Sequence, residues 1–290
     1  MSFEKFYMKN HKKLLIIPIL ILVISIIVLL AQYSINGYIL DKDVSLKGGV
    51  SSTIYVQEDI NIESIESKFL EQYPGSDVSI RKLTNFGTSQ KTGIIIEVTE
   101  VTADQVRTFV QETFNTENYS IQEIGEGLGQ SFFKEMIYAI IFAFILMGIV
   151  VLITFRKLIP SFAVIFSAIL DIVVTLAIIS LLNIKISSAG IAAFLMVLGY
   201  SIDTDILLTT RILKRKIGTI FERLKGAFKT GIVMTTTTIA ALGVAYLATN
   251  STILKQMFGI IIIALVVDII STWIMNAGLI IQYAKKNENK

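Results

Sequence analysis

Two aspartates, Asp203 and Asp205, interrupt an apolar run that begins near residue 186 and is long enough to cross a membrane. An aspartate at the centre of a membrane helix costs about 2.5–3.5 kcal/mol, so such residues are rare unless they have a role. Two other apolar runs carry Asp171 and Asp268, and Arg211 closes the first run. A carboxyl group in low-dielectric surroundings can alternate between charged and neutral forms. We therefore take these five residues as candidates for a proton path.

Helical geometry separates the two neighbouring aspartates. At about 100° per residue, Asp203 and Asp205 lie about 200° apart and point to nearly opposite faces of one helix. Asp203 shares its face with Tyr200, whereas Asp205 shares its face with Ser201 and Thr209. We expect Asp203 to face the interior of a helix bundle, and Asp205 to face a partner, a threonine on the lipid side or cytoplasmic water.

The carboxylates also have a structural explanation, in which they only join helices through hydrogen bonds to threonines such as those at 235–238. We expect no metal, because hard cations need more oxygen ligands than these runs supply. The chain has no cysteine, and its single histidine, His11, falls in a basic N-terminal segment where we expect it to be solvated. No phosphate loop or nucleophile elbow is present, so we expect neither an enzyme, nor a bound cofactor, nor a nucleic-acid partner.

Membrane helices must position these residues. The 290-residue chain is 53% hydrophobic and 17% charged, with a mean hydropathy of +0.68, whereas soluble proteins contain about 25% charged residues. Six runs are long enough to span a bilayer: 14–31, 136–155, 159–182, 186–210, 231–248 and 257–283. The first run could instead be a cleaved signal peptide, but its core is longer than usual and no small-residue cleavage site follows it.

Basic residues gather in the N-terminal tail, at 156–157, in a predicted loop at 211–230 and at the C-terminus. With six spans, these four segments fall on one side of the membrane, and positive residues favour the cytoplasmic side. The sequence therefore predicts a multi-pass protein of the cell membrane with both termini in the cytoplasm. The basic loop would contact anionic lipid headgroups, or else dock to a cytoplasmic partner.

A polar segment of mixed charge, residues 36–130, separates the first two runs. Its β-rich stretches and stretches of helical spacing alternate in the order β-α-β-β-α-β, which is typical of a ferredoxin-like module. Thr102 followed by Gln105 predicts a capping box at the start of the second helix. Gly125, Gly127 and Gly129 are expected to form a flexible joint to the membrane.

The predicted fold is thus an α-helical membrane protein with an α+β ferredoxin-like domain, divided into three parts. These are a cytoplasmic tail with the first membrane helix, an extracytoplasmic domain, and a five-helix bundle with a cytoplasmic C-terminus: residues 1–35, 36–130 and 131–290.

Three patterns resemble those of the SecF family, in particular its archaeal members, and the resemblance covers nearly the whole chain. The stretch after the first span is similar to a D-F-K/T-G-G motif, the third span to a D-V-x-x-T pattern, and the fourth span to G-Y-S-I-N-D-T…R-I. The residues that carry them are Asp43, Gly48 and Gly49; Asp171 and Thr175; and Gly199, Tyr200, Ser201, Ile202 and Arg211.

This resemblance implies half of an RND-type transporter that uses the proton-motive force to help pull secreted chains outward. It also implies four partners: a SecD-like subunit, the Sec translocation channel, secreted polypeptides and membrane lipids. Aligned without gaps, the family's aspartate falls on Thr204, between Asp203 and Asp205, so which carboxylate carries protons stays open. Two other functions stay open as well: an exporter half for lipids or drug-like solutes, and a non-transporting assembly factor or membrane chaperone.

Overall fold

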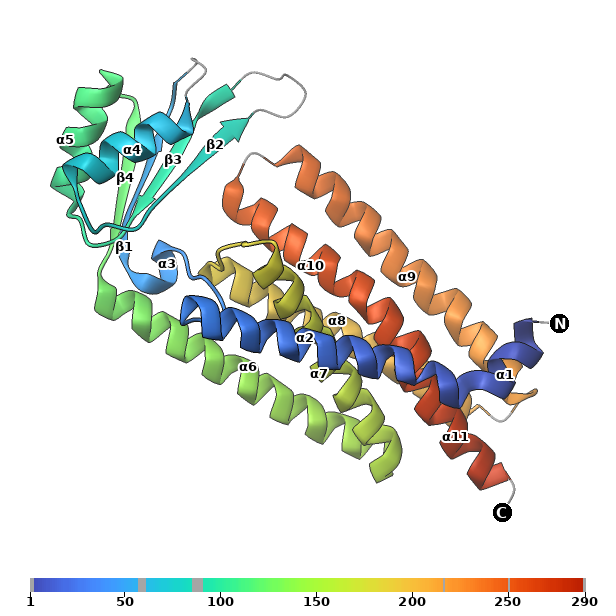
Figure 1. Ribbon diagram of the computed structural model, residues 1–290. Coiled ribbons are helices and arrows are strands. Elements are labelled where there is room, and N and C mark those ends of the chain that lie inside the picture. Colours follow the sequence, from blue (N-terminus) through green and yellow to red (C-terminus); the bar gives the residue numbers. More distant parts are fainter. Residues whose placement is uncertain (1–2, 57–60, 85–90, 216, 250, 289–290) are drawn as a thin grey trace.

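The structure is a computed structural model that describes residues 3–56, 61–84, 91–215, 217–249 and 251–288. Figure 1 shows an elongated helical bundle with a small sheet domain beyond one end. Six helical segments of the described chain are long and apolar enough to cross a membrane, as the sequence predicts. They are α2 (Ile16–Asn36), α6 (Glu126–Phe155), α7 (Leu158–Leu181), α8 (Ser188–Leu213), α9 (Ile220–Ala248) and α10 (Thr252–Ile270) with its continuation.

The sixth segment is not a uniform helix. After α10 the chain passes through a π-helical turn, Ser271–Asn276, and continues as α11 (Ala277–Glu288). Such widened turns often occur at functional sites in helices. The predicted span at 257–283 therefore exists, but with an irregularity that its apolar sequence does not reveal.

The predicted basic loop at 211–230 is largely helical, so that prediction was wrong in its extent. α8 continues to Leu213, and α9 begins at Ile220 with a capping box between Thr219 and Glu222. The capping box satisfies the first backbone N–H groups of α9, so this helix can begin before its apolar run. The basic side chains of this segment consequently lie on two helix ends and a short turn.

The N-terminal tail is also helical. In α1 (Phe3–Leu14), His11 is buried rather than solvated, and its Nδ1 lies 3.0 Å from the carbonyl oxygen of Met8. The burial arises because α1 packs on the last membrane segment: Tyr7 donates a hydrogen bond to the carbonyl oxygen of Trp273 (2.7 Å), and Lys285 donates one to that of Met8 (3.1 Å).

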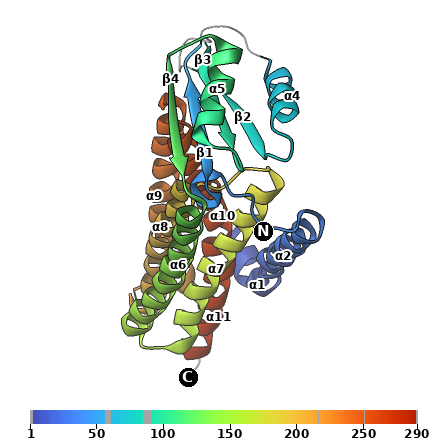
Figure 2. The same ribbon diagram turned by 90° about the vertical axis from the view of Figure 1, so that its left-hand side faces the viewer.

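The sheet domain has the predicted β-α-β-β-α-β order. Its elements are β1 (Gly49–Ile54), α4 (Ile62–Gln72), β2 (Val78–Thr84), β3 (Lys91–Val98), α5 (Ala103–Phe114) and β4 (Tyr119–Ile124). The strands are antiparallel in the order β2-β3-β1-β4, with Ser52 of β1 opposite Ile96 of β3 and Ile121 of β4. The predicted capping box of Thr102 and Gln105 is present. This is a ferredoxin-like module, and Figure 2 shows it beyond the bundle, at the end away from the C-terminus.

The predicted flexible joint is instead a helical connection. Gly125 caps α6, and Gly127 and Gly129 lie within its first turns. A Cβ atom at Gly129 would approach the backbone nitrogen of Gly48 to 2.7 Å. The glycine therefore allows α6 to pack closely against the end of α3 (Val44–Lys47). Domain and membrane helix are joined by packed backbone rather than by a free hinge.

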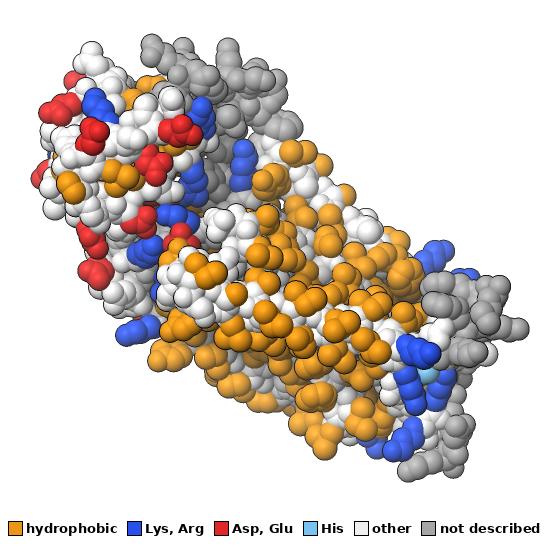
Figure 3. Space-filling view, viewed as in Figure 1, with side chains coloured by type: hydrophobic (Ala, Val, Ile, Leu, Met, Phe, Trp, Pro, Cys, Tyr) orange, Lys and Arg blue, Asp and Glu red, His pale blue; other side chains and the backbone are white. Residues whose placement is uncertain are grey.

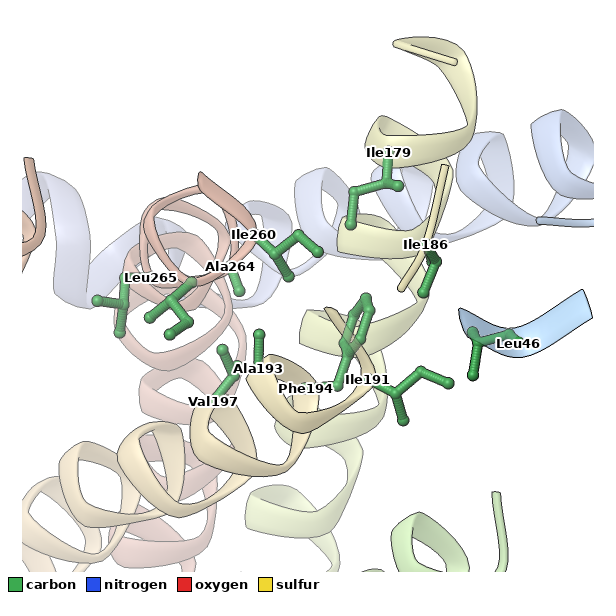
Figure 4. Packing of buried hydrophobic residues seen from close by; sticks show 11 residues of the cluster. Leu46, Ile179, Ile186, Ile191, Ala193, Phe194, Val197, Ile260, Ala264 and Leu265 are labelled. Atoms are coloured by element: carbon green, nitrogen blue, oxygen red, sulfur yellow. The ribbon is translucent and has the colours of Figure 1, made fainter. Parts of the chain in front are cut away.

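On the face of the molecule shown in Figure 3, apolar side chains cover the bundle, whereas charges gather on the sheet domain and at the far end of the helices. Near the domain, an apolar cluster joins α3 to α7, α8 and α10. Figure 4 shows Leu46 of α3 beside Ile191 of α8, in a cluster that also holds Ile186 and Phe194. The bundle thus begins directly beneath the domain.

Candidate functional site

Three of the predicted residues meet in the centre of the bundle. Asp171 comes from α7, Asp205 from α8 and Asp268 from α10, and each is at most 1% exposed. None of the three forms an ion pair with a Lys, Arg or His of the described chain. The site is therefore a buried acidic cluster that has no counter-cation among the described residues.

Hydroxyl groups connect the three carboxyl groups into one chain. Ser201 Oγ lies 2.6 Å from Asp171 Oδ2 and 2.6 Å from Asp268 Oδ1. Thr272 Oγ1 lies 3.1 Å from Asp268 Oδ1 and 2.9 Å from Asp205 Oδ1. The order along this chain is Asp171, Ser201, Asp268, Thr272, Asp205, so it runs from α7 through α8, α10 and the π-helical turn and returns to α8.

The number of hydroxyl hydrogens available as donors requires that some carboxyl groups in this series of side chains carry protons. A hydroxyl group has one hydrogen to donate, so Ser201 and Thr272 together can donate in two of the four contacts. The other two contacts become hydrogen bonds only if carboxyl groups donate. Three ionised carboxylates without a cation would also carry a large desolvation cost. Both arguments favour protonated carboxyl groups in the cluster.

Further polar side chains complete the cluster. Ser271 donates to Asp171 Oδ1, Thr204 Oγ1 lies 3.3 Å from Asp268 Oδ2, and Asn276 Nδ2 donates to Asp205 Oδ1 over 2.7 Å. Ser167 Oγ is 3.5 Å from the same Asp205 oxygen. The π-helical turn matters here because it supplies Ser271, Thr272 and Asn276 from one short segment.

Sequence reasoning missed most of these hydroxyl and amide groups, and the expectation that the threonines at 235–238 would bond the carboxylates was wrong. Thr238 contacts Tyr200 instead, and no described residue hydrogen-bonds the buried Thr235 hydroxyl. The overlooked signal was spacing: Ser271, Thr272 and Asn276 follow Asp268 by three, four and eight residues, and so share its helical face.

The predicted orientation of α8 was also wrong. Asp205 is fully buried with Ser201 and Thr209, whereas Asp203 is exposed on the outer surface of the bundle. The opposite-face geometry holds, but the polar partners of α7 and α10 lie on the side of Asp205. Asp203 has no hydrogen bond or ion pair from its side chain to any described residue.

Arg211 lies apart from the acidic cluster. Its Nη2 donates to Thr230 Oγ1 of α9 over 3.0 Å, and Nη1 lies 3.2 Å from the position of a Cβ atom at Gly226. Arg211 therefore joins α8 to α9 near the end of the bundle away from the sheet domain, rather than pairing with a described carboxylate.

Several buried polar atoms next to the cluster have no partner among the described residues. They are Asp205 Oδ2, Asn276 Oδ1, Thr209 Oγ1 and Thr175 Oγ1. Thr209 lies one helical turn from Asp205 toward the far end, and Thr175 lies one turn from Asp171 toward the domain. Buried polar atoms in such a line are usually satisfied by water.

The motif after the first span forms the contact between domain and bundle. Asp43 caps α3, accepting from the backbone nitrogen of Ser45 (2.9 Å) and from its hydroxyl (2.5 Å). Ser45 Oγ in turn accepts from the backbone nitrogen of Ser188, at the start of α8, over 2.9 Å. Backbone hydrogen bonds also join Asp43 N to Ile186 O (3.0 Å) and Ile186 N to Asp41 O (2.7 Å). Burial raises the pKa of Asp43, although the Ser45 hydrogen bonds and nearby cations oppose the shift.

Ion pairs surround this contact. Lys47 Nζ lies 3.1 Å from both Asp41 Oδ1 and Asp77 Oδ2. On the sheet face that points to the bundle, Arg81 pairs with the buried Glu97, whose pKa burial raises despite the guanidinium beside it. In the part of the chain that the structure describes, no group of three or more His, Cys, Asp or Glu side chains is arranged so that it could hold a metal ion.

Comparison with known proteins places this architecture in a class. Residues 105–286 match the family model described as protein export membrane protein SecD/SecF, C-terminal. SecF from Methanocaldococcus jannaschii is 37% identical over 95% of this chain and 96% of that protein, and SecF from Pyrococcus furiosus is 34% identical over 97% and 94%. The chain belongs to the SecF family of protein-export membrane proteins.

Solved structures agree in fold. The crystal structure of SecDF, a translocon-associated membrane protein from Thermus thermophilus, matches 98% of this chain with a TM-score of 0.75 at 17% identity. SecDF in a super-membrane-facing form matches 98% with a TM-score of 0.63 at 19% identity. The chain spans 38% and 39% of the lengths of those chains.

Proposed function

We propose that this SecF-family chain is an accessory subunit of Sec-dependent protein export that uses proton movement through the acidic cluster to move its sheet domain. Membership of the SecF family supports the export role. The continuous chain from Asp171 through Ser201, Asp268 and Thr272 to Asp205 is the observation that carries the proton coupling.

The proton path would extend beyond the carboxyl groups through water. The unpartnered polar atoms of Thr209 and Asn276 lie on the far side of Asp205, and that of Thr175 lies on the domain side of Asp171. Water bridging these atoms would extend the path by about one helical turn toward each membrane face. Each proton that crosses down a membrane potential releases about 2.3 kcal/mol per 100 mV, which a conformational cycle can use.

A short mechanical connection would transmit changes at the cluster to the domain. α8 carries Ser201 and Asp205 at its centre, and its first backbone nitrogen is held by Ser45 of the motif. Leu46, one residue further, lies in the apolar cluster of α7, α8 and α10 (Figure 4). A shift of α8 would therefore move α3, which leads directly into β1.

The exposed outer face of α8 is evidence for a partner subunit. Met196, Gly199 and Asp203 form an exposed stripe at intervals of three and four residues. A carboxylate facing hydrocarbon is costly, so a protein surface or a water-filled cavity must cover Asp203 in the membrane. A SecD-like subunit is the partner that family membership favours, and it would complete the second half of the transporter-like core. The Sec translocation channel and secreted polypeptides would then contact the assembled pair.

The distribution of basic residues supports one orientation. The end of the bundle away from the sheet domain carries Lys12, Lys13, Arg156, Lys157, Lys285 and Lys286. Positive residues at span ends favour the cytoplasmic side. We therefore place both termini in the cytoplasm and the sheet domain on the outer side of this multi-pass membrane protein.

Two isosteric variants test the proposal. In membrane vesicles with an imposed potential, Asp205→Asn should lower potential-dependent export of a secreted test protein at least about tenfold. An amide group cannot alternate between a protonated and an ionised form as a carboxyl group does. The variant should still copurify with its SecD-like partner. Asp203→Asn, on the opposite face, should instead weaken that copurification.

The opposite pattern would contradict the proposal. Export by Asp205→Asn at the wild-type rate would exclude proton passage through this cluster. Loss of partner copurification in Asp205→Asn, with loss of export only in proportion, would show that the carboxylate has a structural role.

A further inference from the structure

A cleft of about 770 Å³ lies between the sheet domain and the bundle. Its walls come from β2, the turn between α7 and α8, the end of α9 and the first turns of α10. These membrane helices all begin or end here, so the mouth of the cleft lies at the depth of the lipid headgroups on the domain side.

The mouth of the cleft is basic. Arg81, Lys185 and Lys255 line it, and no carboxylate is among the described lining residues. Arg81 pairs with Glu97 but has a buried Nε without a described partner, and Lys185 Nζ lies 3.7 Å from Asp77 Oδ1. Figure 3 shows Lys and Arg side chains where the domain meets the bundle.

Lys255 is the least compensated of the three cations. It is half-buried in the first turns of α10, and its ammonium group has no hydrogen bond or ion pair to any residue that the structure describes. A partly buried cation without a partner favours an anion from outside the chain.

The inner wall of the cleft is apolar. Leu182, Ile260, Ile262 and Ile263 line it. From Lys255 to Ile263, α10 rises by about 12 Å, which carries the wall from headgroup depth into the hydrocarbon. Gly259 keeps this wall open beside Tyr246, because a Cβ atom at this position would already lie 3.5 Å from the Tyr246 ring.

A second cleft, of about 890 Å³, lies on the other side of the domain contact and differs in charge. Lys42, Lys47 and Lys134 line it, but so do Asp77, Glu100, Glu123 and Glu126. Its acidic groups would repel an anion. Arg81 pairs with Glu97, and Lys185 with Asp41 and Asp77, but these carboxylates do not line the first cleft. The first cleft therefore differs from the second in having the unpaired Lys255 above an apolar wall and no carboxylate among its described lining residues.

We propose that the first cleft binds an anionic phospholipid of the surrounding membrane. Lys255 and Arg81 hold its phosphate, and one of its hydrocarbon chains runs along Ile260 and Ile263. The bound lipid touches β2 of the domain and α10 of the bundle together, so it holds the domain in its position over the membrane. This inference does not depend on proton coupling.

Native mass spectrometry of the full chain in detergent tests the proposal, with phosphatidylglycerol, phosphatidylcholine and inorganic phosphate as probes. The wild-type chain should bind phosphatidylglycerol in preference to phosphatidylcholine. Lys255→Gln should weaken phosphatidylglycerol binding about fivefold, the effect of one cation near an anionic lipid. The matched control Lys68→Gln, at an exposed position of α4 in the sheet domain, should leave it unchanged.

Gly259→Leu fills the apolar wall without changing charge, and should lower the binding of both lipids. This variant keeps the test decisive if Lys255→Gln fails to fold. Inorganic phosphate, which lacks hydrocarbon chains, should not displace the lipid. Equal binding of the two lipids, equal effects of the two lysine variants, or displacement by phosphate would each overturn the proposal.

Photo-crosslinking in native membranes distinguishes lipid from polypeptide. A photoreactive side chain in place of Ile263 should capture lipid. Capture of a secreted polypeptide at this position would overturn the proposal, because the cleft would then be a contact surface for export substrates.

Discussion

The sheet domain and the membrane bundle have opposite interiors. In the domain, Phe69 of α4 and Phe109 of α5 pack with ring centroids 4.7 Å apart over the buried side chains of β1 and β3. Around the acidic cluster, the bundle instead buries carboxyl groups, hydroxyl groups and an amide, while its outer surface is largely apolar. The domain follows the usual arrangement in water, and the bundle places its polar groups away from lipid.

This contrast shows which side chains are present for stability and which for function. The aromatic core of the domain removes apolar surface from water and so stabilises the fold. The acidic cluster gains nothing comparable, because burying carboxyl groups is costly even when they are hydrogen-bonded. Under the proposed function, the cluster is retained because its protons are used. The predictions below test this difference.

The largest loss of stability on substitution is expected in the sheet domain. Phe69→Ala removes a fully buried ring and should lower the free energy of unfolding of the domain by about 3–5 kcal/mol. Hydrogen exchange of the β3 amides in the full chain measures this change.

The matching change in the bundle is Asp268→Asn, which removes one buried carboxyl group and keeps its shape. Asp268→Asn removes one of several acids that are buried together, so it should not destabilise the bundle. The hydrogen-exchange rates of the α10 amides should therefore stay the same or fall. Marked destabilisation of the bundle by Asp268→Asn, with a small effect of Phe69→Ala, would reverse the comparison.

A smaller effect is expected where the two regions meet. Gly129→Ala places a methyl group 2.7 Å from the backbone nitrogen of Gly48 and should destabilise the packing of α6 on α3 by about 1–3 kcal/mol. Thermal unfolding of the purified chain, followed by exchange of the β1 and α6 amides, measures it.

Gly127→Ala is the matched control, because no atom lies within 4 Å of the added methyl group. It should be neutral or stabilise α6 by about 1 kcal/mol through helix propensity. Equal effects of the two substitutions would show that the connection is a free joint rather than a packed one.

The domain could be predicted more fully than the bundle from the sequence. The β-branched residues of β1 and β3, the stripe of Ile65 and Phe69, and the capping box at Thr102 all indicate their elements directly. These patterns work because one face of each element is in water and the other is not. The ferredoxin-like order follows from them.

The membrane bundle lacks this difference between a face in water and a buried face. Both faces of a membrane helix are apolar, so periodicity does not show that α8 turns Asp205 inward and Asp203 outward. The opposite faces of the two aspartates were predictable, and so was the shared face of Asp205, Ser201 and Thr209. The choice between the faces depends on Ser271, Thr272 and Asn276, which come from another helix and from a π-helical turn.

Contacts between segments that are far apart in the sequence could not be predicted either. Nothing in the apolar runs shows that Gly129 touches Gly48, that Ser45 caps α8, or that α1 buries His11 against the last membrane segment. Each depends on the arrangement of helices in space. A basic composition suggested a solvated N-terminal tail and a loop at 211–230. Basic residues do not exclude a helix, because helices also carry charged side chains at their ends.

The central claim is that the acidic cluster holds exchangeable protons, and infrared spectroscopy tests it most directly. At neutral pH the purified chain should show the carbonyl stretch of a protonated carboxylic acid, shifted on transfer to heavy water. Asp171→Asn and Asp268→Asn should each weaken that band, while Asp203→Asn should leave it unchanged. Absence of the band in the wild-type chain, or its loss in Asp203→Asn alone, would contradict the account.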